Sequence, residues 1–334
     1  MIRMELGQNS YNIELNRGNL HRAGELLNLN RKVMIVTDTG VPIEYAKIIA
    51  TGCRESYIKV VNQGEGSKSL QTAEEILTEM LNHEFSRKDC VVAVGGGVVG
   101  DLAGVVASLY MRGIDFYNVP TTVLSQVDSS IGGKTAVNLG GIKNVVGAFY
   151  QPKAVLIDPD TLLTLSERQI VNGLMEALKM GATSEPELFY IFKDGNWKDN
   201  IDSIIEKALL VKKYVVEQDE KESHLRKILN FGHTIGHGFE SAAKGELLHG
   251  ECVALGMLYM SNDEVREQLI EIYDRLGFAV PNISEFDLDE VKKAILHDKK
   301  ANNKNCSVVY VSQIGDGQIE EWPMTKVLER LERE

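Results

Sequence analysis

Three histidines in the second half of the sequence could hold a divalent metal ion. His233 and His237 stand at i and i+4, so in a helix they would share one face, and His249 follows in the segment LLHGE. An imidazole pair at this spacing can chelate a cation, and a catalytic metal usually has a third protein ligand and an open position for substrate. The alternative is that these histidines only cap or pack helices.

The spacing does not decide which residue would complete such a metal site. Glu240 and Glu251 are near the histidines in the sequence, whereas Glu176 lies much earlier, in the helical pattern GLMEALK. Spacing alone favours His233 and His237 together with a glutamate, and it leaves all three glutamates open.

A glycine-rich turn could bind a dinucleotide. Gly95, Gly97 and Gly100 fit the pattern G-x-G-x-x-G directly after the apolar run CVVAV. Residues without a Cβ let the backbone approach a pyrophosphate, whose charge is met by amide groups at a helix start. The motif alone is weak, because many such turns only join a strand to a helix. Asp115 and Asp38 are both candidates for the acidic residue that would contact the ribose.

Basic residues stand in unusual surroundings for a protein whose net charge is −12. Lys134 and Lys143 lie among glycines, and Lys179 follows Glu176 by three positions, so those two would share a helical face. A single lysine is usually only solvated, but an acidic protein that gathers cations in one place is suited to hold a small anion. The net charge argues against a general nucleic-acid binder. Further positive charge comes from Lys212, Arg226, Lys299 and Lys300.

Length and composition favour a two-domain globular protein. The chain has 334 residues, of which 43% are hydrophobic and 25% charged. No apolar run is long enough for a membrane helix, and the N-terminal stretch lacks the features of a secretory signal. The four cysteines are far apart and form no C-x-x-C pair, so we expect neither disulfides nor a zinc knuckle, and a cytoplasmic location.

The elements that must position these residues follow two patterns. In the first half, β-branched runs alternate with helical spacing, as in Leu70–Phe85, which predicts a mostly parallel sheet with crossover helices. The expected strands are Lys32–Asp38, Ser56–Val61, Cys90–Val94, Phe116–Val119 and Ala154–Asp158.

The second half is expected to be mainly helical. The expected helices are Ser166–Met180, Asn200–Asp219, Gly232–Ala243, Val253–Leu276 and Asp287–Leu296. Only Cys306–Val311 has the pattern of a strand, and Tyr190–Asn200 is expected to be a loop. The fold class is therefore an α/β N-terminal dinucleotide-binding domain over residues 1–160 and a mainly α-helical metal- and substrate-binding domain over residues 161–334.

Six sequence motifs in order resemble the 3-dehydroquinate synthase family. They are GGGVVGDLAG, RGIDFYNVPTT, VDSSIGGKTAVN, KNVVGAFYQPKAVLID, LNFGHTIGH and LHGE, and the resemblance runs from about Asp38 to about Lys300. It implies a homodimeric lyase that uses NAD+ and one divalent metal ion, Zn²⁺ or Co²⁺. The implied reaction converts 3-deoxy-D-arabino-heptulosonate 7-phosphate to 3-dehydroquinate and phosphate in the shikimate pathway, by transient oxidation, phosphate elimination, re-reduction and an intramolecular aldol closure.

The resemblance also implies roles for individual residues. The implied metal ligands are Glu176, His233 and His249, which makes His237 a substrate-side group. The implied NAD contacts are Asp38, Glu65, Lys68, Gly96, Gly97, Val98, Gly100, Asp101, Thr121, Thr122, Leu124, Lys134, Lys143, Thr161, Thr164 and Asn172. The implied substrate contacts are Asp128, Lys134, Asn144, Lys179, Lys212, Arg226, Asn230, His237 and Lys299 or Lys300, with Lys300 preferred. Arg112 resembles an arginine that reaches a neighbouring subunit's phosphate site.

The sequence departs from the family pattern at Met175, where alanine is more usual, and at His224, where glycine is more usual. The helical stretch Cys252–Phe278 looks shorter than usual. Two alternative functions remain open, namely another sugar phosphate cyclase and a metal-dependent polyol dehydrogenase. The Asp128–Lys134 segment and Arg226 with Asn230 favour a carboxylate-bearing substrate over other cyclase substrates. A dehydrogenase would need no dense cluster of cations.

Overall fold

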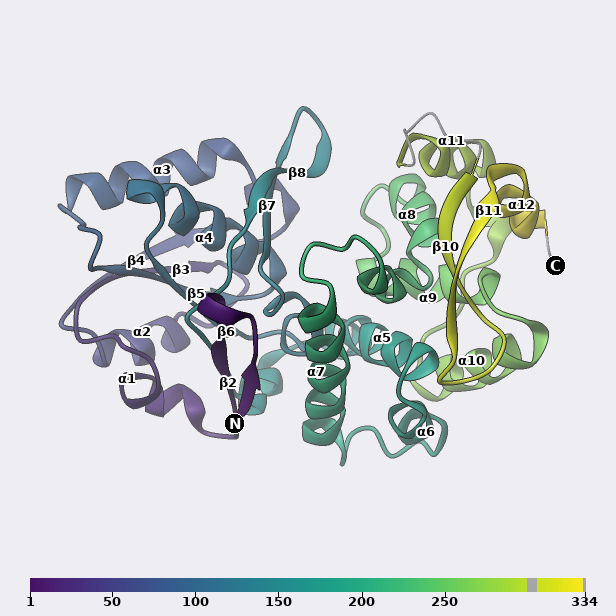
Figure 1. Ribbon diagram of the computed structural model, residues 1–334, viewed down its shortest axis with the longest axis horizontal. Helices are drawn as coiled ribbons and strands as arrows, with labels where there is room; N and C mark the ends of the chain where they lie inside the picture. Colours follow the sequence, from purple (N-terminus) through teal and green to yellow (C-terminus); the bar gives the residue numbers. More distant parts are fainter. Residues whose placement is uncertain (299–304, 333–334) are drawn as a thin grey trace. The chain divides into compact units, whose positions relative to one another are not determined.

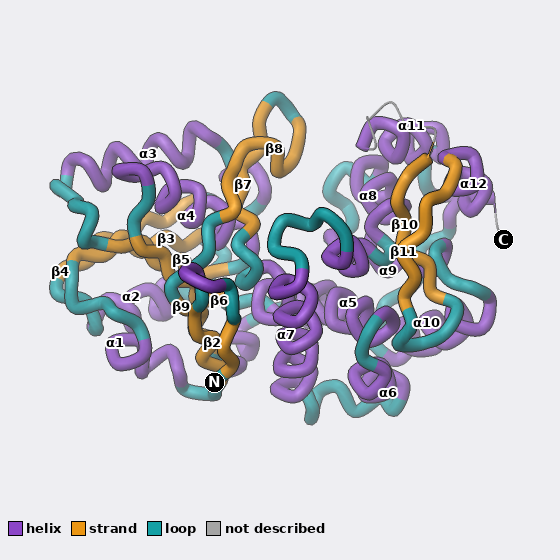
Figure 2. The backbone as a smooth tube through the Cα atoms, in the orientation of Figure 1, coloured by secondary structure: helices purple, strands orange, loops and turns teal. Residues whose placement is uncertain are grey.

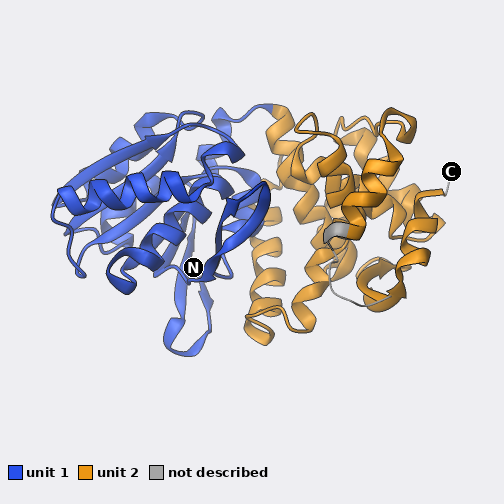
Figure 3. Cartoon of the chain, turned by 90° about the horizontal axis from the view of Figure 1, so that it is seen from above, with its two compact units in different colours: residues 1–166 blue, residues 167–334 orange. Residues whose placement is uncertain are grey.

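The computed structural model describes residues 1–298 and 305–332. It divides into two compact units, Met1–Ser166 and Glu167–Glu334, which Figure 3 shows in different colours. Each unit has its own secondary structure and is described separately.

The first unit is built on a seven-stranded sheet with the strand order β1-β2-β9-β6-β5-β3-β4 (Figure 1). Its neighbouring strands pair in parallel, except for the antiparallel pair β1–β2. The strands are β1 Ile2–Met4, β2 Tyr11–Leu15, β3 Lys32–Asp38, β4 Glu55–Val61, β5 Cys90–Gly95, β6 Asp115–Pro120 and β9 Ala154–Ile157. The expectation of a mostly parallel sheet is confirmed, and the N-terminal strands β1 and β2 are additions to it.

Helices cover both faces of this sheet, and the alternation of side chains along the strands explains why. On one face, Met34 and Val36 pack with residues of α3 and α4, whereas on the other face Val33 and Ile35 pack with residues of α1 and α2 (Figure 1). The helices are α1 Ala23–Leu26, α2 Ile43–Thr51, α3 Leu70–Asn82 and α4 Gly97–Leu109. The central strands are buried on both faces, and their sequences are therefore continuous runs of apolar residues.

A two-stranded hairpin, which the sequence did not predict, follows β6 (Figure 2). Its strands are β7 Lys134–Leu139 and β8 Ile142–Phe149, and they pair antiparallel. Gly140 and Gly141 both have positive φ (60° and 79°), which suits the tight two-residue turn of a hairpin. The glycines beside Lys143 therefore form the turn of this hairpin.

The second unit is mainly helical, as expected (Figure 2). Its elements are α5 Glu167–Thr183, α6 Pro186–Lys193, α7 Ile201–Gln218, α8 His233–Ala242, α9 His249–Tyr259, α10 Asp263–Arg275, α11 Leu288–Asp298, β10 Asn305–Val311, β11 Gly317–Pro323 and α12 Met324–Glu329. No helix in residues 1–298 and 305–332 is both long enough and apolar enough to cross a membrane.

Three expectations about this unit were wrong. The single helix expected over Val253–Leu276 is two helices, because the Asn262 side chain caps α10 by accepting a hydrogen bond from Val265 N at 3.0 Å. The loop expected over Tyr190–Asn200 begins inside α6, which buries Leu188, Phe189 and Phe192. The strand β10 has an antiparallel partner, β11, that the sequence pattern did not reveal.

Candidate functional site

A buried ion pair lies in the middle of α5. Glu176 and Lys179 are three residues apart, so they lie on the same face of the helix, and both side chains are almost fully buried. The Lys179 ammonium contacts Glu176 Oε2. Removing two charges from water is costly, and replacing such a pair with apolar residues is often neutral or stabilising. A charged pair at this place in an otherwise apolar helix face therefore indicates a function rather than a contribution to stability.

Two histidines from other helices face the same carboxylate. His233 begins α8 and His249 begins α9, and their Nε2 atoms lie 3.6 Å and 3.4 Å from Glu176 Oε1. Among the residues that the structure describes, Oε1 of Glu176 has no hydrogen-bond partner, whereas Oε2 is paired with Lys179. One ligand atom from each of the three residues lies within 4.8 Å of the others. Ligands about 2.1 Å from one tetrahedral ion are about 3.4 Å apart, so two imidazoles and the Oε1 atom of a buried carboxylate fit a divalent cation.

Close packing of α8 against α9 brings the two histidines together. A Cβ on Gly236 would lie 2.7 Å from Cys252 O, and a Cβ on Gly256 would overlap the backbone of Gly232. The two helix backbones can therefore approach each other only because these positions lack side chains. The rings of His233 and His249 consequently lie with their centroids 5.3 Å apart.

The other acidic and imidazole candidates have different neighbours. Glu251 accepts hydrogen bonds from Arg168 Nε at 2.7 Å and from Leu248 N at 2.8 Å, so it stabilises the start of α9. Glu240 Oε2 lies 3.0 Å from His249 Nδ1, and the imidazole of His237 is exposed, although the residue as a whole is half-buried. His237, Glu240 and His249 form a second group whose ligand atoms also lie within 4.8 Å of one another. Glu176 therefore lies beside His233 and His249, whereas spacing had favoured a site of His233 and His237.

The charges in this cluster shift its pKa values in different directions. Burial opposes the charge on Glu176, but Lys179 and the two histidines outweigh it and hold the pKa of that carboxyl well below its usual range. Burial, together with Lys179, lowers the pKa of His233 to about 3. Burial also opposes a charge on His249, but Glu176 and Glu240 raise its pKa to about 10. At neutral pH in the absence of metal, the His233 imidazole is therefore neutral, whereas the His249 imidazole is positively charged, with a proton on each ring nitrogen.

Metal binding to the metal-free protein is therefore expected to release one proton, from His249. Below a pKa of about 10, the fraction of His249 able to act as a ligand rises about tenfold per pH unit, so metal affinity is expected to rise about tenfold per pH unit, or about 100-fold between about pH 6 and about pH 8. Competition with a chelator of known pH dependence measures the slope. An affinity that does not change with pH over this range would contradict the expectation.

The glycine-rich turn lies where a dinucleotide site requires it. Gly96 caps the N-terminus of α4, directly after β5. Asp38 ends β3, which is the parallel neighbour of β5, so Asp38 and the turn lie at the same edge of the sheet. Asp115 begins β6 at the opposite edge and pairs with Arg31 at 2.6 Å. Asp115 is therefore excluded as the ribose contact, and Asp38 remains.

Four of the residues implied for the cofactor or substrate form one polar network in the first unit. Lys68 Nζ lies 2.6 Å from Asp101 Oδ2 and 2.5 Å from Asn144 Oδ1. Asn138, which was not predicted, joins the network by donating from Nδ2 to Glu65 Oε1 at 2.8 Å and accepting on Oδ1 from Asn144 N at 2.9 Å. Its only signal in the sequence is its place at the end of the motif VDSSIGGKTAVN.

The remaining candidates of the first unit lie on loops and element ends. Gly97, Val98 and Gly100 are in the first turns of α4; Thr121, Thr122 and Leu124 follow β6; Asp128 is in the π-helix Ser125–Ser129; Lys134 begins β7; Lys143 is in β8; Arg112 ends the short turn Tyr110–Arg112; and Thr161 and Thr164 are in the 3-10 helix Pro159–Thr164. Gly96 is close to Thr122, since a Cβ there would lie 3.1 Å from the threonine methyl.

Three buried cations lie in the described part of the second unit. Lys179 on α5, Lys212 on α7 and Arg226 in the short helix η7 (Leu225–Asn230) are all buried, and these three elements pack together. Positive charge gathered in a buried place is suited to hold an anion. Asn230 also lies in η7 and donates to Glu222 Oε1 at 2.7 Å. Asn172 on α5 accepts from Gly250 N at 2.7 Å, and Lys299 and Lys300 lie outside the described residues.

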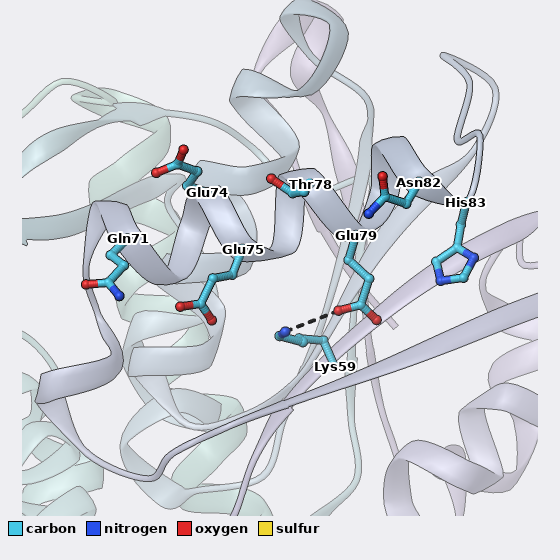
Figure 4. A pocket seen from close by; sticks show the side chains of 8 residues that line it. All are labelled: Lys59, Gln71, Glu74, Glu75, Thr78, Glu79, Asn82 and His83. Carbon is cyan, nitrogen blue, oxygen red and sulfur yellow. Dashed lines mark ion pairs between the residues drawn. The ribbon is translucent and has the colours of Figure 1, made fainter.

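A polar hollow on the surface of the first unit contains none of the predicted site residues (Figure 4). Lys59 and Glu79 form an ion pair of 3.2 Å across it. Its lining residues are Lys59, Gln71, Glu74, Glu75, Thr78, Glu79, Asn82 and His83, most of them on α3. The hollow is therefore separate from the residues that could bind a cofactor.

Comparisons with known proteins agree with the sequence motifs. Models of the 3-dehydroquinate synthase N-terminal and C-terminal regions match residues 58–172 and 173–301. A 3-dehydroquinate synthase of Streptococcus thermophilus is 38% identical and aligns over 99% of each chain.

Solved structures of sugar phosphate cyclases share the fold. A 2-epi-5-epi-valiolone synthase from Streptomyces hygroscopicus subsp. jinggangensis, solved with NAD+ and Zn²⁺ bound, has a TM-score of 0.87 and 26% identity over 98% of this chain and 97% of that one. A 2-deoxy-scyllo-inosose synthase has a TM-score of 0.86 and 24% identity over 99% of this chain and 98% of that one. The resemblance is thus confirmed over nearly the whole sequence, and the chain belongs to the 3-dehydroquinate synthase family.

Proposed function

We propose that this protein is a 3-dehydroquinate synthase, which converts 3-deoxy-D-arabino-heptulosonate 7-phosphate to 3-dehydroquinate and phosphate with NAD+ and a divalent ion, Zn²⁺ or Co²⁺. Family membership over the whole chain supports the reaction. The observation that carries the metal assignment is Oε1 of the buried Glu176 carboxylate, which has no hydrogen-bond partner among the described residues and lies beside the Nε2 atoms of His233 and His249.

The proposed metal ligands are Glu176, His233 and His249 of the second unit. NAD binding is assigned to the first unit, at Asp38, the Gly95–Gly100 turn and the network of Glu65, Lys68 and Asp101. When bound, the divalent ion supplies Lewis acidity toward a substrate hydroxyl, and the nicotinamide takes up and returns one hydride.

The protein's own side chains hold the charged ends of the substrate and move its protons. We assign Lys212, Arg226 and Asn230 to binding and orientation, which favours the intramolecular ring closure because it removes the entropic cost of bringing the reacting groups together. Lys179 and Arg226, which are buried and therefore weakly screened, stabilise the negative charge that grows on the departing phosphate. His237 is exposed beside His233 and transfers protons between substrate hydroxyls.

Lys134, Asp128 and Asn144 of the first unit are proposed as further substrate contacts. We also propose a homodimer, in which Arg112 serves the partner's phosphate site. Exposed apolar side chains on the β7–β8 hairpin, including Ile142, Val145 and Phe149, support an interface of this kind. Light scattering measures the mass, and a monomer at micromolar concentration would contradict the dimer. The cytoplasmic location stays a prediction.

Phosphate release tests the proposed reaction directly. With the heptulosonate phosphate and catalytic NAD+, we expect one phosphate per 3-dehydroquinate, no net absorbance at the NADH band, loss of activity with a chelator, and recovery on adding Zn²⁺ or Co²⁺. Net NADH without phosphate would instead identify a polyol dehydrogenase. Turnover of other sugar phosphates, but not of this one, would identify a different cyclase.

A further inference from the structure

Glu240 lies on the same face of α8 as two of the histidines. His233, His237 and Glu240 stand at i, i+4 and i+7, so their side chains project from one side of the helix. Glu240 Oε2 lies 3.0 Å from Nδ1 of His249, at the start of the neighbouring helix α9. His249 directs its other ring nitrogen, Nε2, toward Glu176 Oε1 at 3.4 Å. The two nitrogens of one imidazole therefore have different carboxylate partners.

The chemistry of the ring makes this arrangement directional. A neutral imidazole has one N–H donor and one lone pair, and an ionised carboxylate can only accept hydrogen bonds. In the metal-bound state, in which His249 has lost one proton and is neutral, Glu240 would accept from Nδ1–H and the lone pair would stand on Nε2, the atom that faces Glu176. Histidines that bind metals commonly donate their other N–H to a carboxylate or carbonyl in this way.

His233 shows the same orientation with a different partner. Its Nδ1 lies 3.2 Å from the backbone carbonyl of Phe231, and its Nε2 faces Glu176 Oε1 at 3.6 Å. Both histidines thus present Nε2 to the Glu176 carboxylate and anchor Nδ1 elsewhere, His233 on a neutral carbonyl and His249 on a charged carboxylate. Two independent side chains in matching orientations indicate one shared ion position rather than a chance contact.

The second group of possible ligands, His237, Glu240 and His249, competes with this arrangement. An ion bound there would need the lone pair on Nδ1 of His249, and the proton would then stand on Nε2, facing the first site. A neutral His249 can serve only one of the two groups. The anchoring of His233 favours the group that contains Glu176.

We propose that Glu240 is a positioning residue of the metal site, not a ligand: it fixes the tautomer and the ring orientation of His249 through Nδ1. The inference rests on the proposed function, because it assumes that Glu176, His233 and His249 hold the ion. It adds a residue that the family resemblance did not supply and that spacing had offered only as a possible ligand.

The test compares zinc binding in the wild type, Glu240→Ala, Glu240→Gln and the control Glu246→Ala. The control removes the same charge from an exposed position just before α9. Zinc stoichiometry is measured by mass spectrometry, the dissociation constant by chelator competition, and folding by thermal unfolding. Glu240→Ala is expected to keep one zinc but to bind it about 10–100-fold more weakly. Glu240→Gln keeps an acceptor oxygen and is expected to lose less, and Glu246→Ala to bind as the wild type does.

Nitrogen-15 NMR of the zinc-loaded protein separates positioning from general destabilisation. We expect the wild type to show His249 bound through Nε2 with a slowly exchanging Nδ1–H, and Glu240→Ala to keep the Nε2 bond but to exchange that proton quickly. Wild-type zinc affinity in Glu240→Ala would overturn the inference while leaving the metal site intact. Loss of the zinc equivalent in Glu240→Ala but not in His233→Ala would make Glu240 a ligand. A wild-type protein that binds no zinc would instead overturn the proposed function.

Discussion

Replacing His249 with alanine is expected to abolish both metal binding and turnover, while NAD affinity stays close to that of the wild type. His249 supplies one of the three ligand atoms of the proposed set, the others coming from Glu176 and His233. Losing a ligand costs more than the 10–100-fold typical of losing a supporting residue, so affinity is expected to fall more than about 100-fold. Lewis-acid stabilisation of several kcal/mol then disappears, and turnover is expected to fall at least about 10³-fold. The affinity for NAD is expected to stay close to that of the wild type because NAD binding is assigned to residues of the first unit, namely Asp38, the Gly95–Gly100 turn and the Lys68 network.

Metal content by mass spectrometry, phosphate release and NAD binding by calorimetry measure the three quantities. His237→Ala is the matched control, because it removes an imidazole from the same cluster but not from the proposed ligand set. It is expected to keep the metal even if it slows turnover. Unchanged metal content in His249→Ala would refute the ligand set, and metal loss in His237→Ala as well would favour the group of His237, Glu240 and His249.

The Gly256→Ala substitution is expected to destabilise the protein and weaken its metal site together. The added Cβ would overlap backbone atoms of Gly232, which cannot rotate away as a side chain can, and it would lie 2.8 Å from Gly236 N. The helices α8 and α9 must then separate, which places the cost at the upper end of overpacking, about 3 kcal/mol. For a unit of this size, Tm is expected to fall by about 6–12 °C. The separation also moves His233 away from His249, so zinc affinity is expected to fall.

Calorimetry and zinc competition on the same samples test both effects. Gly66→Ala is the control: it makes the same chemical change where nothing lies within 4 Å of the added carbon and φ is not left-handed. It is expected to leave zinc affinity unchanged. A Gly256→Ala protein with wild-type Tm and zinc affinity would show that the helix crossing can relax without disturbing the histidines.

The sequence predicted the first unit well because parallel strands carry a local signal. Strands such as Lys32–Asp38 are buried on both faces, so each is a continuous apolar run that needs no knowledge of its neighbours. The sequence failed where a signal had two physical causes. The glycines beside Lys143 indicated the surroundings of an anion site, but Gly140 and Gly141 form a hairpin turn, and the apolar periodicity of Val253–Leu276 concealed the capped break at Asn262.

By itself, the sequence determined the family, the mostly parallel sheet, the helical second half and the types of side chain available for chemistry, because these depend on composition, periodicity and ordered motifs. Only the tertiary structure decided which side chains meet. Spacing along one helix pairs His233 with His237, but the glycine contacts between α8 and α9 bring His249 to His233, and α5 adds Glu176 from a distant part of the chain. A ligand set drawn from three helices depends on how those helices pack, and no local pattern in the sequence records that packing.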